Sequence, residues 1–160
     1  MIDAPKGGCA FCLIVRKETP LSIVYEDDFT FAFLDAKPIN EGHTLVIPKK
    51  HYQTIFEMPD EEVARLFTIV RRTAIAVKNG VEASGIVIIQ RNGRAAHQLV
   101  PHVHVHVIPQ HTTQLMTSQM RLAGISRQRL DYIAGKIRSD STRAKRKLEL
   151  KFTRYSQDNS

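Results

Sequence analysis

Apolar residues along the first 110 positions fall into two kinds of pattern, namely short apolar runs and one longer amphipathic stretch. In the longer stretch, apolar residues from Val63 to Val77 recur at helical spacing, and Pro59 with the acidic residues after it begins a helix that Asn79-Gly80 ends. The short runs are rich in valine, isoleucine and phenylalanine, and they predict five β-strands. These strands are expected at residues 22–26, 29–34, 44–47, 85–90 and 102–108.

The order of these elements indicates the fold class. Three strands precede the helix and two follow it, and short turns such as the one at residues 26–28 are typical of antiparallel neighbours. We therefore expect an α+β fold, an antiparallel sheet with one long helix after the third strand. A chain of 160 residues is long enough for a single domain with its own core.

The last of the five runs alternates histidine with valine, placing His102, His104 and His106 at every second position. Successive side chains of a strand point to opposite faces, so the three imidazoles share one face and the valines share the other. The valine face suits a hydrophobic core. Three neighbouring imidazoles that titrate near neutral pH suit chemistry instead.

Two kinds of chemistry suit such a histidine face. It can hold a metal ion, as three-histidine zinc sites do, or it can present one imidazole as a nucleophile while its neighbours position it and bind anionic oxygens. Three same-face residues of a regular strand span about 13 Å, which is too far for all three to hold one ion. At least one histidine therefore has a separate role, and the spacing alone leaves the choice open.

This run resembles the signature of the histidine triad (HIT) family, His-φ-His-φ-His-φ-φ with φ apolar, here His102 to Ile108. The similarity covers roughly Cys9 to Gln110, in matching order and spacing, and several separated segments agree. It implies the α+β fold and a homodimer in which two sheets join into one. The other matching segments are 31–35, 42–51, 92–93 and 98–100.

The resemblance implies a hydrolase or transferase acting at the α-phosphorus of a purine nucleotide. His104 is the implied nucleophile, and it would form a covalent nucleotidyl-histidine that water cleaves. A protonated His106 would contact the phosphate or the leaving group, and His43 would support the histidine face from a neighbouring strand. Asp35 would accept hydrogen bonds from the ribose hydroxyls, since a carboxylate offers two acceptor oxygens. The implied substrates are nucleoside phosphoramidates, with dinucleoside polyphosphates as the alternative.

Cys9 and Cys12 are the only cysteines, and they form a C-x-x-C pair. By itself such a pair is either a redox dithiol or half of a zinc site, and the βαβ context of a redox pair is missing here. In many members of the HIT family two histidines complete a zinc site, and the corresponding residues are His51 and His102. A closed set of two cysteines and two histidines implies structural Zn²⁺. His102 would then serve the metal, and His104 and His106 the phosphate.

Three features depart from the family pattern near the phosphate site. Arg91 stands where a side-chain amide that binds the scissile phosphate is expected, so either Arg91 or Asn92 takes this role. His97 replaces the glycine of the usual Ala-Gly-Gln turn, just before Gln98, a further expected nucleotide-binding residue. The chain has no tryptophan, which the phosphoramidase branch carries near its C-terminus. The sequence therefore leaves the leaving group open.

Positive charge concentrates at the C-terminal end. Up to Met120, twelve lysines and arginines balance twelve acidic residues, whereas residues 121–160 hold eleven against four, which is the whole net charge of +7. We expect a HIT domain over residues 1–120 and a basic extension over 121–160. Apolar residues from Leu122 to Ile137 predict that the extension begins as a docked helix. Its basic residues could bind nucleic acid, but such a run is more often a solvated surface.

The remaining sequence features bear on location and on other function classes. No run of about 18 apolar residues is present to span a membrane, and Asp3 argues against a transit peptide. We expect a cytoplasmic location, with a nuclear location as the alternative. Two alternatives from other classes are a metal-dependent phosphohydrolase with the triad as catalytic ligands, and a nucleotide-sensing module with weak catalysis.

Overall fold

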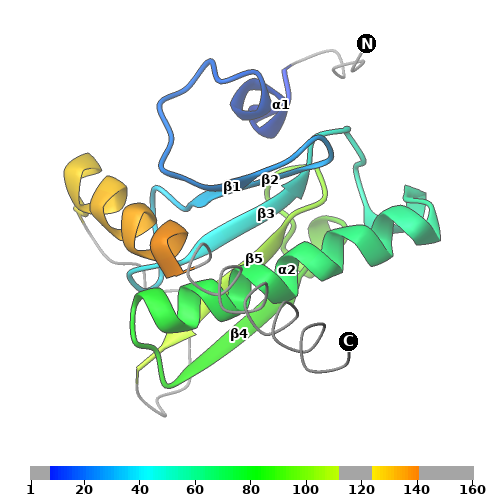
Figure 1. Cartoon of the computed structure of the whole chain (residues 1–160). Helices are drawn as coiled ribbons and strands as arrows, with labels where there is room; N and C mark the ends of the chain where they lie inside the picture. Colours follow the sequence, from blue (N-terminus) through cyan, green and yellow to red (C-terminus); the bar gives the residue numbers. More distant parts are fainter. Residues whose placement is uncertain (1–7, 112–123, 141–160) are drawn as a thin grey trace, which may run out of the picture.

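The computed structural model describes residues 8–111 and 124–140, which form a five-stranded antiparallel sheet with helices on both of its faces (Figure 1). The strand order is β1-β2-β3-β5-β4, so β5, which carries His106 of the triad, lies inside the sheet between β3 and β4. The elements are α1 (Ala10–Val15), β1 (Ile23–Glu26), β2 (Thr30–Leu34), β3 (Thr44–Pro48), the 3₁₀ helix η1 (Ile55–Glu57), α2 (Asp60–Gly80), β4 (Gly85–Gln90), the 3₁₀ helix η2 (Arg94–Ala96), β5 (Val105–Gln110) and a helix at 127–140.

The predicted fold class is confirmed, and the long helix follows the third strand as expected. The turn between β1 and β2 is closed by Asp27, whose Oδ1 accepts hydrogen bonds from the backbone N–H groups of Phe29 (2.9 Å) and Thr30 (2.5 Å). A carboxylate that bonds the backbone two residues on is typical of tight turns.

One strand starts more than one residue away from its predicted first residue. The expected strand 102–108 begins only at Val105. The N–H of His102 bonds the carbonyl of Val100 at 2.8 Å, and the N–H of Val103 bonds the carbonyl of Tyr52 at 2.7 Å. The backbone before Val105 is therefore held by local and loop contacts, outside the sheet.

The two faces of the sheet bury different cores. Val103, Val105 and Val107 are fully buried in the larger core, which α2 and the helix at 127–140 cover. On the opposite face, Phe31 and Phe33 of β2 pack with residues of β3 and α1 in a smaller core. The valine face is thus the core face, as predicted, and the histidine face lies on the side of α1.

The helix at 127–140 packs beside the end of α2 (Figure 1). Its residues Leu130, Ile133 and Ile137 are buried, in agreement with the predicted docked helix, while Leu122 lies outside the described residues. Arg129 donates two hydrogen bonds to the carboxylate of Glu41, at 2.8 and 2.7 Å. This helix therefore shares the core of the sheet.

Two expectations stay predictions, the division into domains and the homodimer. The boundary between residues 120 and 121 and the basic segment 141–160 lie outside the described residues, so the division into domains is untested. The homodimer is also untested, although β4 forms one edge of the sheet. In the part of the chain that the structure describes, no helix is both long and apolar enough to cross a membrane.

Candidate functional site

A cavity of about 240 Å³ opens on the histidine face of the sheet. Its floor carries two histidines of the triad, and its walls come from α1, from the loop after β2 and from the segment after β4. The lining residues are Phe11, Asp35, Ile39, His43, Leu45, Ile89, Arg91, His97, Leu99, Val100, His104, His106 and Ile108.

His104 is a buried imidazole whose Nδ1 is held by a hydrogen bond. It is only 5% exposed, and its Nδ1 lies 2.7 Å from the carbonyl oxygen of His102. A carbonyl only accepts hydrogen bonds, so Nδ1 carries the proton and Nε2 keeps its lone pair. Burial lowers the pKa of His104, which keeps the ring neutral at neutral pH.

His43 and His106 form a hydrogen-bonded pair, with His43 Nε2 2.9 Å from His106 Nδ1. The backbone N–H of Ile39 donates to His43 Nδ1 at 3.2 Å, so the proton of His43 is on Nε2 and is donated to His106. The proton of His106 is therefore on Nε2. Through this relay His43 sets the tautomer of His106, and the expected support from a neighbouring strand is present.

The expected positive charge on His106 is corrected by the structure. Burial, followed by the nearby His43 and His104, lowers the pKa of His106 to about 3. The ring is thus neutral at physiological pH, because desolvation disfavours the charged form. His106 can still donate one hydrogen bond from Nε2, but the cationic side chain that lines this cavity is Arg91.

The structure separates the roles of Arg91 and Asn92. Arg91 lines the cavity, whereas Asn92 Oδ1 accepts hydrogen bonds from the N–H of Ile55 (2.9 Å) and from Gln90 Nε2 (3.0 Å). Asn92 Nδ2 in turn donates to Gln90 Oε1 at 2.6 Å. Asn92 therefore ties the end of β4 to η1, and Arg91 is the residue of the two that lines the cavity.

Gln98 and His97 shape the turn beside the cavity. The buried Gln98 accepts from the N–H of Gly93 at 2.6 Å and donates to the carbonyl of Gln53 at 2.7 Å, so its amide holds two loops together. His97 lines the cavity with a left-handed backbone, φ 60° and ψ 34°, which non-glycine residues rarely adopt. Direct contact of Asn92 or Gln98 with a nucleotide stays a prediction.

Asp35 lies at the other end of the cavity. Its Oδ1 accepts a hydrogen bond from the N–H of Lys37 at 2.8 Å, and its Oδ2 is 3.6 Å from His43 Nδ1. Asp35 is thus both a turn residue and part of the cavity wall. The role of its carboxylate toward a ribose stays a prediction.

Phe11 is a cavity residue that the sequence analysis missed. Its ring lies edge-on to His104, with 5.1 Å between ring centroids, and edge-on to Phe33 at 5.9 Å. No periodicity marks a residue on a helix as short as α1. The available signal was its position between Cys9 and Cys12, because a pair that joins His102 also brings Phe11 to the triad.

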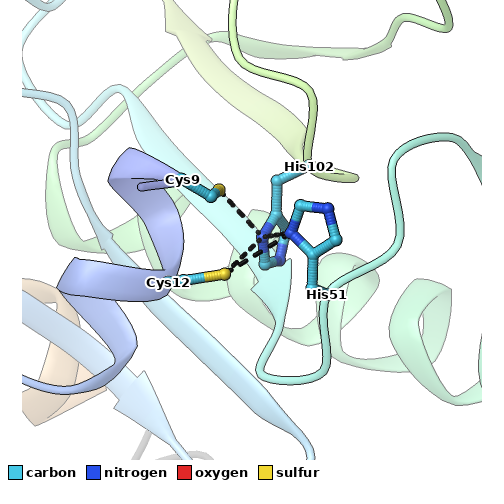
Figure 2. A group of neighbouring side chains, drawn as sticks. All are labelled: Cys9, Cys12, His51 and His102. Carbon is cyan, nitrogen blue, oxygen red and sulfur yellow. Dashed lines mark hydrogen bonds between the residues drawn. The ribbon is translucent and has the colours of Figure 1, made fainter. Parts of the chain in front are cut away.

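Cys9, Cys12, His51 and His102 form a candidate metal site (Figure 2). The sulfur of Cys9 lies 3.5 Å from His102 Nδ1, and that of Cys12 lies 3.4 Å from His51 Nδ1 and 3.7 Å from His102 Nδ1. The two Nδ1 atoms are 3.2 Å apart. With ligand bonds of about 2.0–2.3 Å, the edges of a tetrahedral zinc site measure about 3.3–3.8 Å, so the four ligand atoms fit such an ion.

The surroundings prepare these side chains for a metal. His102 Nε2 donates a hydrogen bond to the carbonyl of Pro48 at 2.9 Å, which leaves Nδ1 without a proton. Burial, then the neighbouring Cys9, raises the pKa of Cys12 to about 11, so a cation is needed to hold that sulfur as a thiolate. The set is closed, as in structural sites, and it takes His102 away from the cavity. The three triad histidines therefore do not form one ligand set.

The comparisons with known proteins agree with this geometry. The HIT domain model matches residues 16–113, which is more than half of the chain. The chain belongs to the HIT family. Both signatures of the sequence analysis, the alternating histidines and the upstream segments, lie largely inside the matched region.

Several curated HIT relatives are similar to the chain. An uncharacterised HIT-like protein of Methanocaldococcus jannaschii is 47% identical over 103 residues, 64% of this chain and 79% of the relative. The adenosine 5′-monophosphoramidase of Candida albicans is 38% identical, and the match covers 66% of this chain and 72% of that protein. The adenylylsulfatase of Arabidopsis thaliana is 38% identical, with 65% of this chain covering 53% of that protein. Two of these three relatives thus carry enzyme names, one as a phosphoramidase and one as a sulfatase.

Solved HIT structures share the fold. A zinc-bound histidine triad family protein from Mycobacterium smegmatis has a TM-score of 0.75 and 32% identity, and the match covers 86% of this chain and 96% of that one. That protein holds zinc, and the Cys9, Cys12, His51 and His102 cluster is where this chain could hold a metal.

Proposed function

We propose that this protein is a hydrolase that cleaves purine nucleotides at the α-phosphorus through a covalent intermediate on His104. The observation that carries the proposal is the 2.7 Å hydrogen bond between His104 Nδ1 and the His102 carbonyl, which leaves the lone pair on Nε2. A buried, neutral imidazole of this kind is a good nucleophile at neutral pH. Relatives named adenosine 5′-monophosphoramidase support the same activity.

The proposed reaction has two steps. His104 Nε2 attacks the α-phosphorus, and the bond between phosphorus and the leaving group breaks with its electron pair moving to the leaving group. Water then attacks the same phosphorus and loses a proton, the P–N bond breaks, and its electron pair returns to Nε2. Over the two steps, the proton lost by water balances the proton gained by an amine leaving group. His106, with its proton on Nε2, donates a hydrogen bond to a phosphoryl oxygen or to the leaving group in both steps.

The nucleoside would occupy the end of the cavity beside Asp35. Phe11, Ile39 and Leu45 give this end apolar walls that suit a purine ring. The Asp35 carboxylate would accept the ribose hydroxyls. The reference substrate of this proposal is a purine nucleoside 5′-phosphoramidate, and dinucleoside polyphosphates are the alternative.

We also propose that the metal is structural zinc, held by Cys9, Cys12, His51 and His102. Zinc would supply a cross-link between α1, the segment after β3 and the segment before β5. A homodimer and a cytoplasmic location complete the proposal.

Replacing His104 tests the proposed activity. His104→Ala should lower kcat by several orders of magnitude while AMP still binds, because the nucleophile is lost and the ribose contacts remain. Quenching the reaction of wild-type protein with labelled substrate and mapping the adduct by mass spectrometry should place the nucleotide on His104. His111→Ala is the matched control, since His111 is exposed and lies outside the cavity lining.

Two results would contradict the proposal. The first is an adduct on any residue other than His104. The second is a His104→Ala variant that keeps wild-type turnover after its folding has been verified by thermal unfolding.

A further inference from the structure

Arg91 is a partly buried cation with no counter-ion in the described part of the chain. Its side chain lines the cavity, and within residues 8–111 and 124–140 its guanidinium has no salt bridge and no hydrogen bond to a side chain. Burial lowers the pKa of His104 and of His106, and the charge of Arg91 lowers both further. A partly desolvated guanidinium without a carboxylate partner is typical of a site that binds an anionic ligand.

The ends of β4 and β5 place Arg91 on the same face as the proposed nucleophile. The pairing of β4 with β5 runs from Gly85↔Gln110 to Gln90↔Val105, so His104 and Arg91 lie just beyond the last pair. Ile89 faces His106 in this pairing, and alternation along the chain puts Arg91, two residues on, on the histidine face. Both Arg91 and His104 line the cavity.

Asp35 and Arg91 mark opposite ends of this face. Asp35 follows β2, whereas Arg91 follows β4, and β3 and β5 separate these two strands in the sheet. His106 and His104 lie on the floor between them. A nucleotide whose ribose lies at Asp35 and whose α-phosphorus lies at His104 therefore points its leaving group toward the strand that ends at Arg91.

We propose that Arg91 is a specificity-determining residue that binds an oxyanion on the leaving group, so that the chain prefers phosphoric anhydrides of a nucleotide to phosphoramidates. This inference rests on the proposed attack at the α-phosphorus, and within that function it favours the alternative substrates, the anhydrides, over the phosphoramidate. The anion is a phosphate or a sulfate joined to the α-phosphate through a bridging oxygen. Both are tetrahedral oxyanions that a guanidinium can bind through two parallel hydrogen bonds.

The chemistry of the two leaving groups explains the preference. When His104 attacks an anhydride, the bond between the α-phosphorus and the bridging oxygen breaks, and its electron pair leaves with the phosphate or sulfate. The negative charge that develops there is stabilised by a nearby cation. A phosphoramidate instead loses an amine, whose nitrogen must gain a proton as the P–N bond breaks. A guanidinium gives no such stabilisation to a group that becomes neutral or positive.

Arg91→Gln tests the inference on the purified full-length protein. The probes are adenosine 5′-phosphosulfate, diadenosine triphosphate and adenosine 5′-phosphoramidate. Loss of a charge-assisted hydrogen bond should lower kcat/KM for the anhydrides by about 10- to 100-fold, while kcat/KM for the phosphoramidate changes by less than about threefold. Arg91→Lys should recover part of the anhydride activity, since the charge remains and the fork geometry is lost.

The control separates this role from a structural one. Arg94→Gln removes the same charge from an exposed neighbour outside the cavity lining. It should leave kcat/KM unchanged for the anhydrides and for the phosphoramidate. AMP lacks the leaving group, so its Kd, measured by calorimetry, should be the same for wild type and Arg91→Gln. Loss on the phosphosulfate alone or on the diadenosine substrate alone also supports the inference and identifies the anion.

Other outcomes overturn it. Equal losses on anhydrides and phosphoramidate, together with weaker AMP binding, would mean that Arg91 holds the α-phosphate. Unchanged kinetics on every substrate would mean that Arg91 is only solvated. Wild-type protein that turns over none of the three probes would refute the proposed function itself, a result distinct from both.

Discussion

Removing the metal from the Cys9, Cys12, His51 and His102 cluster should destabilise the protein strongly while leaving its chemistry nearly intact. The cluster joins α1 to segments that lie far along the chain, and Cys9 and His102 are 93 residues apart. Without a metal, nothing covalent or coordinative links these segments, because both cysteines are free thiols. The perturbation is therefore the loss of a long-range cross-link.

The size of the effect follows from the length of the closed loop. In the chain-entropy treatment, a cross-link over about 90–100 residues lowers the entropy of the unfolded chain by the equivalent of about 4–5 kcal/mol. For a chain of this size, each 1 kcal/mol shifts Tm by about 2–4 °C. Full metal removal should thus lower Tm by about 8–20 °C.

The assay compares loaded and metal-free protein by thermal unfolding, with zinc content measured by elemental analysis. One zinc per chain is expected in the loaded form, and adding zinc back should restore Tm. Cys12→Ser should lower Tm in the same direction, whereas His111→Ala, outside the cluster, should not. At a temperature where both forms stay folded, kcat should agree within about threefold, because no catalytic atom belongs to the cluster.

The result that would refute this reasoning is a metal-free protein with the Tm of the loaded one. Absence of zinc from protein purified without chelators would do the same. A large loss of kcat in folded, metal-free protein would mean that the metal also orients the catalytic residues.

Two further predictions concern packing and nucleoside binding. Gly80→Ala should lower the free energy of unfolding by about 1–3 kcal/mol, because the new Cβ would lie 2.9 Å from the Cα of Ile137. This loss outweighs the better helix propensity of alanine. Gly135→Ala should instead raise the free energy of unfolding by about 0.5–1 kcal/mol, because its Cβ would meet only the Arg138 side chain, at 3.9 Å. Urea unfolding measures both, and changes of the same sign would contradict the docking of the helix at 127–140. Asp35→Asn should raise KM about tenfold for ribonucleotides and leave a 2′,3′-dideoxy substrate unaffected; equal effects on both substrates would exclude the ribose contact.

The strands and the long helix could be predicted because each has one buried side. Alternation in the triad run identified the valine face correctly, since the residues from Val103 to Val107 on that face are fully buried. The start of β5 was predicted three residues too early. The side-chain pattern continues through His102 and His104, but the backbone there bonds Val100 and Tyr52, and periodicity does not report backbone partners.

The choice between Arg91 and Asn92 could not be made from the sequence. Both residues follow β4 directly, and both could bind a phosphate. Their difference arises from Asn92, whose amide is held by the N–H of Ile55, 37 residues earlier in the chain, and by Gln90 at the end of β4. Only the folded arrangement of these loops leaves Arg91 on the cavity side.

His102 explains how one short histidine run serves two different sites. Its imidazole lies in the cluster, where Nδ1 contacts Cys9, Cys12 and His51, while its backbone carbonyl accepts a hydrogen bond from His104 Nδ1. The cavity uses a backbone atom of His102, and the metal uses its side chain. Replacing the His102 side chain would therefore remove a metal ligand without removing the acceptor that sets the tautomer of His104. Because Val103 ties this backbone to Tyr52 independently, the acceptor has a support that does not depend on the metal.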